Sequence, residues 1–562
     1  MPTAAPLLLT GVGVGRGAVV GPVAQAQPPL DVAPDAVVGA SPAESGEIVE
    51  AAFLAVAEKL RAQSEAAAGT VREVLAATAG IAADTALRSQ VGTRIAAGEP
   101  PVAAIDAVVD GFAQMFAAAG GYLAERVTDL HSVRERVVAT ALGLATPGVP
   151  ELVVPSVVVA RDLAPADTAA LDLAKVLAIV TELGGPTGHT AIIAGQLGIP
   201  CVVQVSGATD LADGLVIGVD AKAGTVQVEP GVDVQQSFVQ RQQALDALAS
   251  DVAAGGTSDG RVVGLLANIG TAADAVRAAT TSVEGVGLFR TEVLFLERST
   301  APTVDEQADV YAQVLSALGG RKVVVRTLDA GADKPLAFAH QASEENPALG
   351  VRGYRLVRTS PDLLDTQLRA LAAAQDRTGI QPWVMAPMVS TPAEAAAFAT
   401  AARAHGLTTV GVMVEVPAAA LRAREILAEV DFVSLGTNDL AQYTMATDRL
   451  RGELADLLDP WQPAVLDLVA ATARAGVQAG KPVGVCGESA GDPLMALVLT
   501  GLGITSLSMS PASTATVRYA LRQHTHAQCQ EMAAAALAAT DASAARAAVG
   551  DLLAPHTRDT LL

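Results

Sequence analysis

Three arginines and two acidic residues in the second half of the sequence could together bind a small anionic substrate. Arg290, Arg326 and Arg449 carry planar guanidinium groups, which match carboxylate and phosphate oxygens through paired hydrogen bonds. Glu415 and Asp439 offer hard oxygen ligands, and two carboxylates that leave positions for water and a substrate phosphate are a usual arrangement for Mg²⁺. A salt bridge would explain any one arginine alone. Several such groups after successive apolar runs favour a single site for a substrate with phosphate and carboxylate groups.

A second reactive centre is predicted around His189, within the segment ELGGPTGHTAIIAGQLGIPCVV. The apolar run VLAIV predicts a strand, Gly184 and Gly185 predict a loop, and the residues from His189 onward predict a helix. Backbone N–H groups at a helix start favour an anion, so a phosphate carried on this imidazole would be stabilised there. A histidine is more often structural, but the glycine loop, the helix start and the lack of nearby metal-ligand residues favour a covalent phosphohistidine over a zinc site.

The cysteines indicate a reducing compartment and add one candidate catalytic group. Cys201, Cys486 and Cys529 are far apart and odd in number, which favours reduced thiols in the cytoplasm over a disulfide framework. Cys486 lies between Gly484 and Glu488, directly after an apolar run. Its position is equally compatible with simple packing and with a catalytic role.

The elements that must position these groups are short apolar runs separated by segments with helical periodicity. Eight such runs begin at Val262, Gly285, Lys322, Trp383, Thr409, Asp431, Lys481 and Thr505. Eight strand–helix alternations over this length predict a (β/α)8 barrel, whose active face is formed by the C-terminal ends of its strands. Most runs end on polar or ionisable residues, among them Arg290, Arg326, Glu415, Asn438 with Asp439, and Cys486 with Glu488. The chemistry is therefore expected to gather at this end of the barrel.

The first half of the sequence has three other patterns. Residues 1 to about 25 predict short strands, the Ala-rich stretch 41–142 predicts antiparallel helices with a break at 98–101, and 152–230 alternates strands with helices. Residues 231–257 are polar with helical periodicity and predict a linker helix. The chain is long enough for several domains, each with its own core.

Composition excludes some classes of function. The chain has 562 residues with 37 basic and 59 acidic side chains, a net charge of −22 and no basic stripe, so nucleic acid is a poor partner prediction. The start of the chain does not have the pattern of a signal peptide. Residues 494–517 carry no charge over a length that could span a membrane, but their Gly, Pro, Ser and Thr residues favour a buried strand with a flanking loop. We therefore expect a soluble protein.

Several long motifs together resemble one enzyme family. In order along the chain they are GGPTGHTAIIA, GLFRTEVLFLER, VVVRTLDAGADKP, EENPALGVRGYR, VGVMVEVPAAA, SLGTNDLAQYTMATDR and VCGESAGDP. They resemble Enzyme I, the phosphoenolpyruvate–protein phosphotransferase of the sugar phosphotransferase system. The resemblance runs over nearly the whole chain, from LTGVGVGRG to SMSPAS. Each motif is many residues long, so the probability that all of them occur together by chance is negligible.

The resemblance implies a fold and its division into domains. It implies a multidomain α/β protein in which a swivelling phosphohistidine domain carries an inserted helical bundle and precedes a TIM barrel. The implied parts are 1–25 with 146–230 for the phosphohistidine domain, 26–145 for docking of the carrier protein HPr, 231–257 for the linker helix, and 258–562 for the phosphoenolpyruvate-binding barrel with its C-terminal helices. A homodimer through the barrel is also implied.

The resemblance also implies roles for single residues. His189 is the phosphorylated histidine, Cys486 is the acid that protonates the enolate, and Mg²⁺ is the cofactor. The implied phosphoenolpyruvate-binding residues are Arg290, Arg326, Asn438, Asp439 and Arg449, and the implied Mg²⁺ ligands are Glu415 and Asp439. The sequence departs from the family pattern at Pro186, Gly188 and Ala332, none of which removes a reacting group.

Two alternatives remain at this point. A phosphoenolpyruvate synthase or pyruvate phosphate dikinase shares the mobile histidine and the barrel, but needs an ATP-grasp domain before the histidine domain. Only about 150 residues precede it here, helical in pattern and without a glycine-rich phosphate loop. A regulatory protein that only docks a carrier is the other alternative, and the retention of every reacting group argues against it.

Overall fold

The computed structural model contains two compact units, Met1–Gln243 and Ala244–Leu562, and each is described by itself. The structure describes residues 7–561 apart from 16, 28–31, 67–69, 120–125, 145–147, 151, 164–166, 168–170, 172–174, 186–189, 192, 193, 195–198, 296, 297, 299, 332–335, 337, 339–343 and 449–451.

The first unit contains a mixed eight-stranded sheet in the order β1-β8-β7-β3-β4-β5-β6-β2. The strands are β1 (Leu8–Thr10), β2 (Val12–Val14), β3 (Ala18–Gln25), β4 (Ser156–Ala160), β5 (Val176–Thr181), β6 (Cys201–Val203), β7 (Val216–Asp220) and β8 (Thr225–Val228). Alternate residues of β4 belong to different apolar clusters, so this strand is buried on both faces, as its continuous valine run predicts. Strand β3 pairs in parallel with β4 although a helical region separates them in sequence. The helices are therefore an insertion into this α/β domain.

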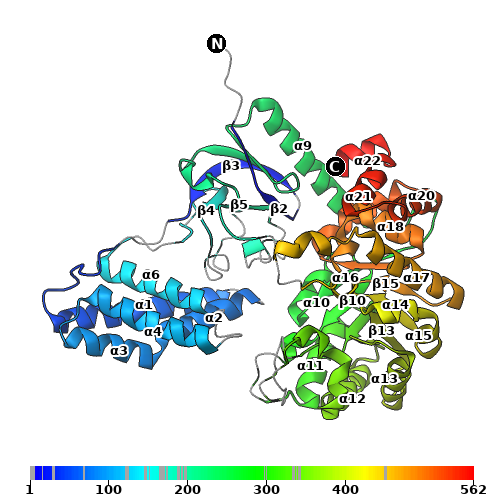
Figure 1. The fold of residues 1–562 in the computed structure, drawn as a ribbon, viewed down its shortest axis with the longest axis horizontal. Helices are drawn as coiled ribbons and strands as arrows, with labels where there is room; N and C mark the ends of the chain where they lie inside the picture. The colour runs from blue at the N-terminus through cyan, green and yellow to red at the C-terminus, as the bar shows by residue number, and fades with distance from the viewer. Residues whose placement is uncertain are drawn as a thin grey trace. The chain divides into compact units, whose positions relative to one another are not determined.

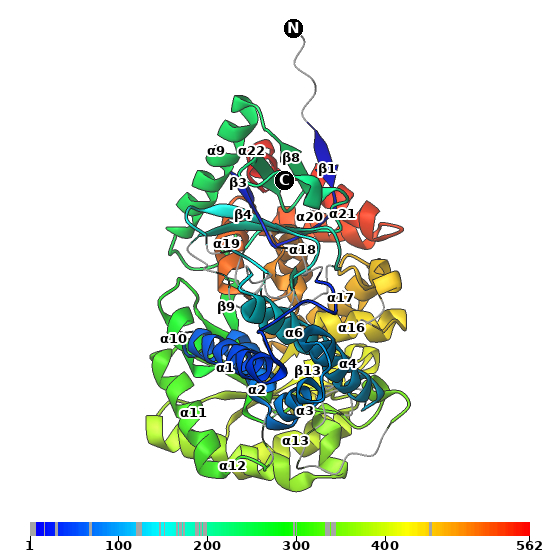
Figure 2. The same ribbon diagram turned by 90° about the vertical axis from the view of Figure 1, so that its left-hand side faces the viewer.

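The inserted helices share one apolar core. They are α1 (Pro42–Ala66), α2 (Thr70–Ala83), α3 (Thr85–Ala96), α4 (Pro101–Ala119) and α6 (Val127–Leu142). Phe53, Leu87, Ile105 and Val137 meet in that core, and both ribbon views show these helices lying against one another (Figures 1 and 2). The gap between α3 and α4 confirms the break predicted at 98–101.

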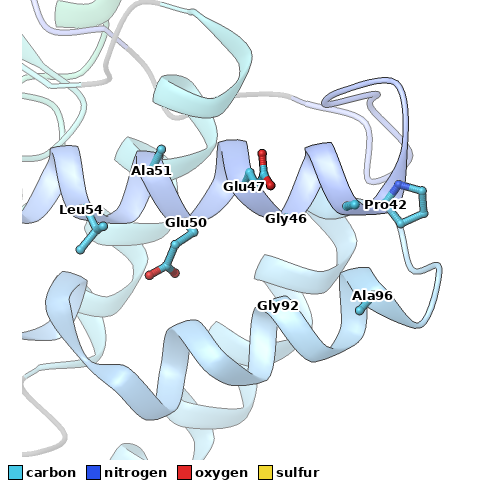
Figure 3. Close-up of a pocket in the computed structure, with 9 residues that line it drawn as sticks. Pro42, Gly46, Glu47, Glu50, Ala51, Leu54, Gly92 and Ala96 are labelled. Carbon is cyan, nitrogen blue, oxygen red and sulfur yellow. The ribbon is translucent and has the colours of Figure 1, made fainter.

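A shallow groove lies between the first half of α1 and the last turns of α3 (Figure 3). Glycine and alanine residues form part of its lining, with Gly46 on α1 facing Gly92 and Ala96 on α3. Glu47 and Glu50 lie along α1 at its edge. The groove is a feature of the helical region alone.

Helix α9 (Val232–Ala249) connects the α/β domain to the barrel. The helix ends at Ala249, before the end of the predicted range 231–257. Arg518 donates to the backbone carbonyl of Asp251 at 2.8 Å, and Arg522 binds the Asp251 carboxylate with two contacts of 3.0 and 2.8 Å. These bonds attach the segment after α9 to the barrel unit.

The second unit is a closed parallel barrel in the order β10-β11-β12-β13-β14-β15-β16-β9. Its strands are β9 (Gly264–Ile269), β10 (Gly285–Arg290), β11 (Lys322–Arg326), β12 (Trp383–Ala386), β13 (Thr409–Val414), β14 (Phe432–Leu435), β15 (Val483–Val485) and β16 (Ser506–Met509). Each of the eight predicted runs contains one of these strands. The predicted fold class, an α/β domain with inserted helices followed by a (β/α)8 barrel, is confirmed.

The helices of this unit cover the outside of the barrel, as Figure 1 shows for α11, α12 and α13. They are α10 (Ala272–Ala279), α11 (Val304–Ala317), α12 (Pro361–Thr378), α13 (Pro392–Ala404), α14 (Pro417–Leu421), α15 (Ala423–Glu429), α16 (Thr437–Met445), α17 (Pro463–Ala479), α18 (Pro493–Leu502), α19 (Thr514–Arg522), α20 (His526–Leu537), α21 (Ala542–Asp551) and α22 (Pro555–Leu561). Capping boxes fix the starts of several of them, for example Thr303 with Glu306 at α11.

The uncharged stretch 494–517 differs from its prediction as a buried strand with a flanking loop. It contains most of α18, then β16 and the start of α19. Helix α18 is buried on all sides from Pro493 to Thr500, so it has no polar face and its sequence lacks the helical alternation that would have revealed it. Among the described residues, no helix combines the length and apolarity needed to cross a membrane.

Candidate active site

The predicted rim residues that the structure describes lie at the C-terminal ends of the barrel strands. Arg290 and Arg326 are the last residues of β10 and β11, and they are exposed and buried respectively. Glu415 directly follows β13, and Cys486 directly follows β15. Asp439 lies in the first turn of α16, immediately beyond β14. Because all these strands are parallel, their ends meet at one mouth of the barrel.

Charged side chains form a continuous buried array at this mouth. Arg326 contacts the Glu292 carboxylate at 2.8 Å and the Asp329 carboxylate at 3.2 Å. Arg352 binds Asp329 at 2.9 Å and Asp439 at 3.1 Å. Burial by itself lowers the pKa of Arg326, but the surrounding carboxylates raise it more, so this guanidinium stays charged. The array holds two cations in fixed directions at the mouth, which is a suitable setting for a phosphate.

Glu415 is the best candidate for holding a cation. Its side chain is fully buried, Oε1 accepts a hydrogen bond from the Met388 N–H at 2.5 Å, and no described residue is a hydrogen-bond partner of Oε2. Gly436 lies beside that oxygen, where a Cβ atom would come within 2.9 Å of Oε2. Burial, together with the charges of Asp439 and Asp329, raises the pKa of Glu415 to about 8.

These features fit a Mg²⁺ ion held by few protein ligands. An unpartnered carboxylate oxygen beside a glycine, with Asp439 close enough to raise its pKa, is a hard oxygen environment that a divalent cation would complete. Among the described residues, no three His, Cys, Asp or Glu side chains could form a metal cage by themselves. A cation here would take its other ligands from water and substrate, as Mg²⁺ usually does.

The thiol of Cys486 is buried inside the barrel mouth. It is 3% exposed and lies 3.5 Å from the carbonyl oxygen of Leu435, to which it donates. Asn268 holds the Cys486 carbonyl at 3.2 Å, and Ser508 in turn donates to Asn268 at 2.7 Å. Burial raises the pKa of the Cys486 thiol, so the group is protonated at neutral pH and has a proton to give.

Comparison with known proteins places this geometry in a family. Models of phosphoenolpyruvate-utilising enzymes match residues 10–126 (N-terminal part), 153–224 (mobile domain) and 248–526 (PEP-binding domain). The chain is 49% identical to the phosphoenolpyruvate-protein phosphotransferase of Streptomyces coelicolor over 97% of this chain and 99% of that protein. The chain belongs to the phosphoenolpyruvate-protein phosphotransferase family of enzymes. A member from Haloferax volcanii is 40% identical over 80% of this chain and 81% of its own, and one from Bacillus sp. (strain S) is 40% identical over 75% of each.

The remaining predicted site residues of this family member have mixed placements. Asn438 is exposed at the start of α16, and its side-chain oxygen accepts from the Glu488 N–H at 3.2 Å. His189 and Arg449 lie outside the described residues, as do the departures at Pro186, Gly188 and Ala332. The described residues Arg326, Glu415, Asp439 and Cys486 lie close enough to interact electrostatically. Asp439 raises the pKa of Glu415, and Glu415 and Cys486 both raise the pKa of Arg326.

Three members of the charged array were not among the site residues predicted from the sequence: Glu292, Asp329 and Arg352. Glu292 and Asp329 follow the last residues of β10 and β11 by two and three positions, so the same rule of polar strand ends could have found them. Arg352 lies in the long segment between β11 and α12, after Gly350, and among the described residues of that segment no strand precedes it. A lone arginine in such a segment gives no signal by itself.

Proposed function

We propose that this chain transfers the phosphoryl group of phosphoenolpyruvate to His189 and then to the carrier protein HPr, releasing pyruvate, as the first step of sugar uptake by the phosphotransferase system. The observation that supports this most is the 49% identity to a phosphoenolpyruvate-protein phosphotransferase over nearly the full length of both chains. The charged array at the barrel mouth gives the proposal its chemistry. The same full-length match favours it over a dikinase.

The arginines of the mouth would bind the substrate. Arg290, Arg326 and Arg449, with Asn438, would hold the phosphate and carboxylate of phosphoenolpyruvate by charge-assisted hydrogen bonds. Phosphoryl transfer depends almost entirely on positioning and on neutralising charge on the phosphoryl oxygens. Glu292 and Asp329 fix the direction of Arg326, so little reorganisation is needed when substrate arrives.

Glu415 and Asp439 would hold the Mg²⁺ ion. The bound cation would neutralise part of the negative charge that the phosphoryl oxygens carry. Arg352 keeps the Asp439 carboxylate at a fixed place, 3.1 Å from its guanidinium.

Two bonds change in the transfer, and Cys486 completes it. The imidazole nitrogen of His189 forms a bond to phosphorus in line with the breaking bond between phosphorus and the enol oxygen. The enolate that leaves takes a proton at its methylene carbon from the Cys486 thiol and becomes pyruvate. Water returns the proton to the thiolate. The raised pKa of Cys486 supports its role as a proton donor.

The other parts of the chain would bring His189 to its two partners. The helical region 26–145 would dock HPr, and swivelling about the α9 linker would carry the phosphohistidine domain between the mouth and the carrier. A homodimer through the barrel completes the proposal.

The histidine assignment is tested with His189→Ala in the full chain. We expect the variant to fold but to take no acid-labile label from radiolabelled phosphoenolpyruvate, because imidazole is the only proposed acceptor. A second assay supplies phosphorylated HPr, which should not label the variant either. Acid-labile label on His189→Ala from either donor would contradict the proposal.

A further inference from the structure

Four fully buried polar side chains connect the ends of strands β10 and β11 to helices α11 and α12. They are Thr291, Gln307, Tyr311 and Gln367, here called the Gln367 network, and each is at most 1% exposed. Gln307 and Tyr311 come from α11, and Gln367 comes from α12. Buried polar groups are stable only when they are hydrogen-bonded. The partners of these four side chains therefore identify the segments that the network holds in place.

Gln367 uses both ends of its amide. Its Oε1 accepts a hydrogen bond from the Leu328 backbone N–H at 2.9 Å. Its Nε2 donates to the Thr291 hydroxyl at 3.1 Å and to the Tyr311 hydroxyl at 2.9 Å. One side chain thus connects the segment after β10, the segment after β11 and helix α11.

The partners of Gln367 extend the connection. Thr291 donates from Oγ1 to the backbone carbonyl of Arg326 at 2.9 Å. Tyr311 donates to Gln307 at 3.0 Å, and Gln307 donates to the Pro302 carbonyl at 3.0 Å. Tyr311 also packs edge-to-face on Phe289, with ring centres 6.1 Å apart. Each hydroxyl therefore has both a donor and an acceptor role, which fixes the network in one arrangement.

The two segments held by Gln367 are those that carry the charged array. Thr291 lies between Arg290 and Glu292, and Leu328 directly precedes Asp329. A single oxygen, Glu292 Oε1, accepts from Arg326 at 2.8 Å and from the Asp329 backbone N–H at 3.0 Å. Any relative shift of the two segments would change the distances between Arg326 and the carboxylates of Glu292 and Asp329.

We propose that Gln367 is a positioning residue for phosphoryl transfer, which sets the spacing between the ends of β10 and β11 and so the directions of Arg290 and Arg326. The inference rests on the proposed function, because it assigns to Gln367 an effect on the step that uses phosphoenolpyruvate. Gln367 acts through backbone groups and Thr291 and does not touch the substrate. Attraction between an arginine and a phosphate falls slowly with distance, whereas in-line transfer needs alignment within a fraction of an ångström.

The test compares the two half-reactions of the full chain. In Gln367→Met, which keeps the side-chain length but removes the amide, we expect the maximal single-turnover rate of labelling from phosphoenolpyruvate to fall about 10- to 100-fold. The phosphoenolpyruvate concentration at half-maximal rate should change less than about threefold, because the cations remain at the mouth. Exchange of phosphate between the chain and phosphorylated HPr does not use the barrel and should keep its rate.

Matched variants separate positioning from packing. Gln375→Met changes the same residue type two turns later on α12, where the amide donates to the Gly406 carbonyl at 3.4 Å, and should leave both half-reactions unchanged. Thr291→Val keeps the shape but cuts the link to Arg326, and should reproduce the Gln367→Met effect. The double variant should be no slower than the slower single variant, because both substitutions break the same hydrogen-bond network and their effects should not add.

The possible results separate a failure of this inference from a failure of the proposed function. Equal labelling rates from phosphoenolpyruvate in wild type and in folded Gln367→Met and Thr291→Val overturn the inference, as does an equal loss in both half-reactions. If Gln367→Met does not fold, Tyr311→Phe removes one arm of the network with its packing intact, and an unchanged rate there overturns the inference as well. Absence of label on the wild-type chain would instead refute the proposed function itself.

Discussion

The two ends of the barrel surround a cation with different kinds of side chain. Strand β11 begins at Lys322 and ends at Arg326, an even spacing that points both side chains to the same face. Arg326 at the C-terminal end is surrounded by Glu292, Asp329 and Glu415. Lys322 at the N-terminal end lies instead over aromatic rings, 3.8 Å from the centre of Trp383 and 5.8 Å from that of Phe432.

The surroundings decide what each cation can do. Carboxylates keep Arg326 charged and directed, so it is available for an anion that enters the mouth. Burial lowers the pKa of Lys322 to about 8, and its ring contacts recover only part of the lost hydration. Phe432 reaches across the strands because position 411 is glycine, where a Cβ atom would come within 2.5 Å of its ring. One end of the barrel is therefore arranged for binding and the other for closure.

The largest effect that should distinguish the two ends is expected at Cys486. We predict that Cys486→Ala slows pyruvate formation about 10²- to 10⁴-fold, the usual cost of losing a positioned general acid, with little change in phosphoenolpyruvate affinity. Steady-state kinetics with calorimetric binding checks both parts. Cys529→Ala is the matched control, because that thiol is also fully buried in the barrel unit but lies in α20. An unchanged turnover in Cys486→Ala would mean that the thiol has a packing role and no catalytic role.

An intermediate effect is expected in the pH dependence of Mg²⁺ binding. The pKa of Glu415 is raised to about 8, so below that pH a proton occupies the carboxylate and must leave before the cation binds. The apparent Mg²⁺ affinity should therefore fall about tenfold for each pH unit below 8 and level off above it. Glu415→Gln should bind Mg²⁺ weakly and without this slope. A wild-type affinity that does not change between pH 6 and pH 9, measured by titration calorimetry, would exclude Glu415 as the ligand.

The barrel could be predicted from sequence because its strands have a simple physical signature. A parallel strand buried on both faces needs a continuous apolar run such as VVV at 323–325, and the polar residue after it marks where that run ends. Helix α18 could not be found in this way, since a helix buried on all sides has no alternation of apolar and polar residues.

The site was only partly predictable for a related reason. Glu415 and Cys486 directly follow strands, so the pattern points to them. Arg352 and Gln367 come from a connecting segment and from the middle of a helix, and only the folded arrangement brings them to the strand ends. Gln367 in particular looks like an ordinary polar residue of an amphipathic helix, and its burial is visible only when α11 and the two strand ends surround it.

The smallest effect on activity is expected at the closed end of the barrel. We predict that Lys322→Met leaves phosphoryl transfer unchanged and makes the barrel about 1–2 kcal/mol more stable at pH 7, because it removes a half-buried ammonium whose ring contacts offset only part of its desolvation. Below pH 8 the lysine is charged in both the folded and unfolded chain, so this difference is constant. Between pH 8 and about 10.4 the unfolded chain binds a proton that the folded chain does not, and wild-type stability rises relative to the variant.

The difference in free energy of unfolding between wild type and Lys322→Met should therefore narrow as the pH rises from 8 to 10. Calorimetric melting of the full chains at several pH values would measure it. Lys322→Arg supplies the control, because a guanidinium keeps its charge over this range and should not gain stability relative to Lys322→Met. If Lys322→Met is instead less stable at pH 7, the contact with Trp383 outweighs the cost of burial. The closed end would then hold its cation as firmly as the mouth does, by aromatic faces in place of carboxylates.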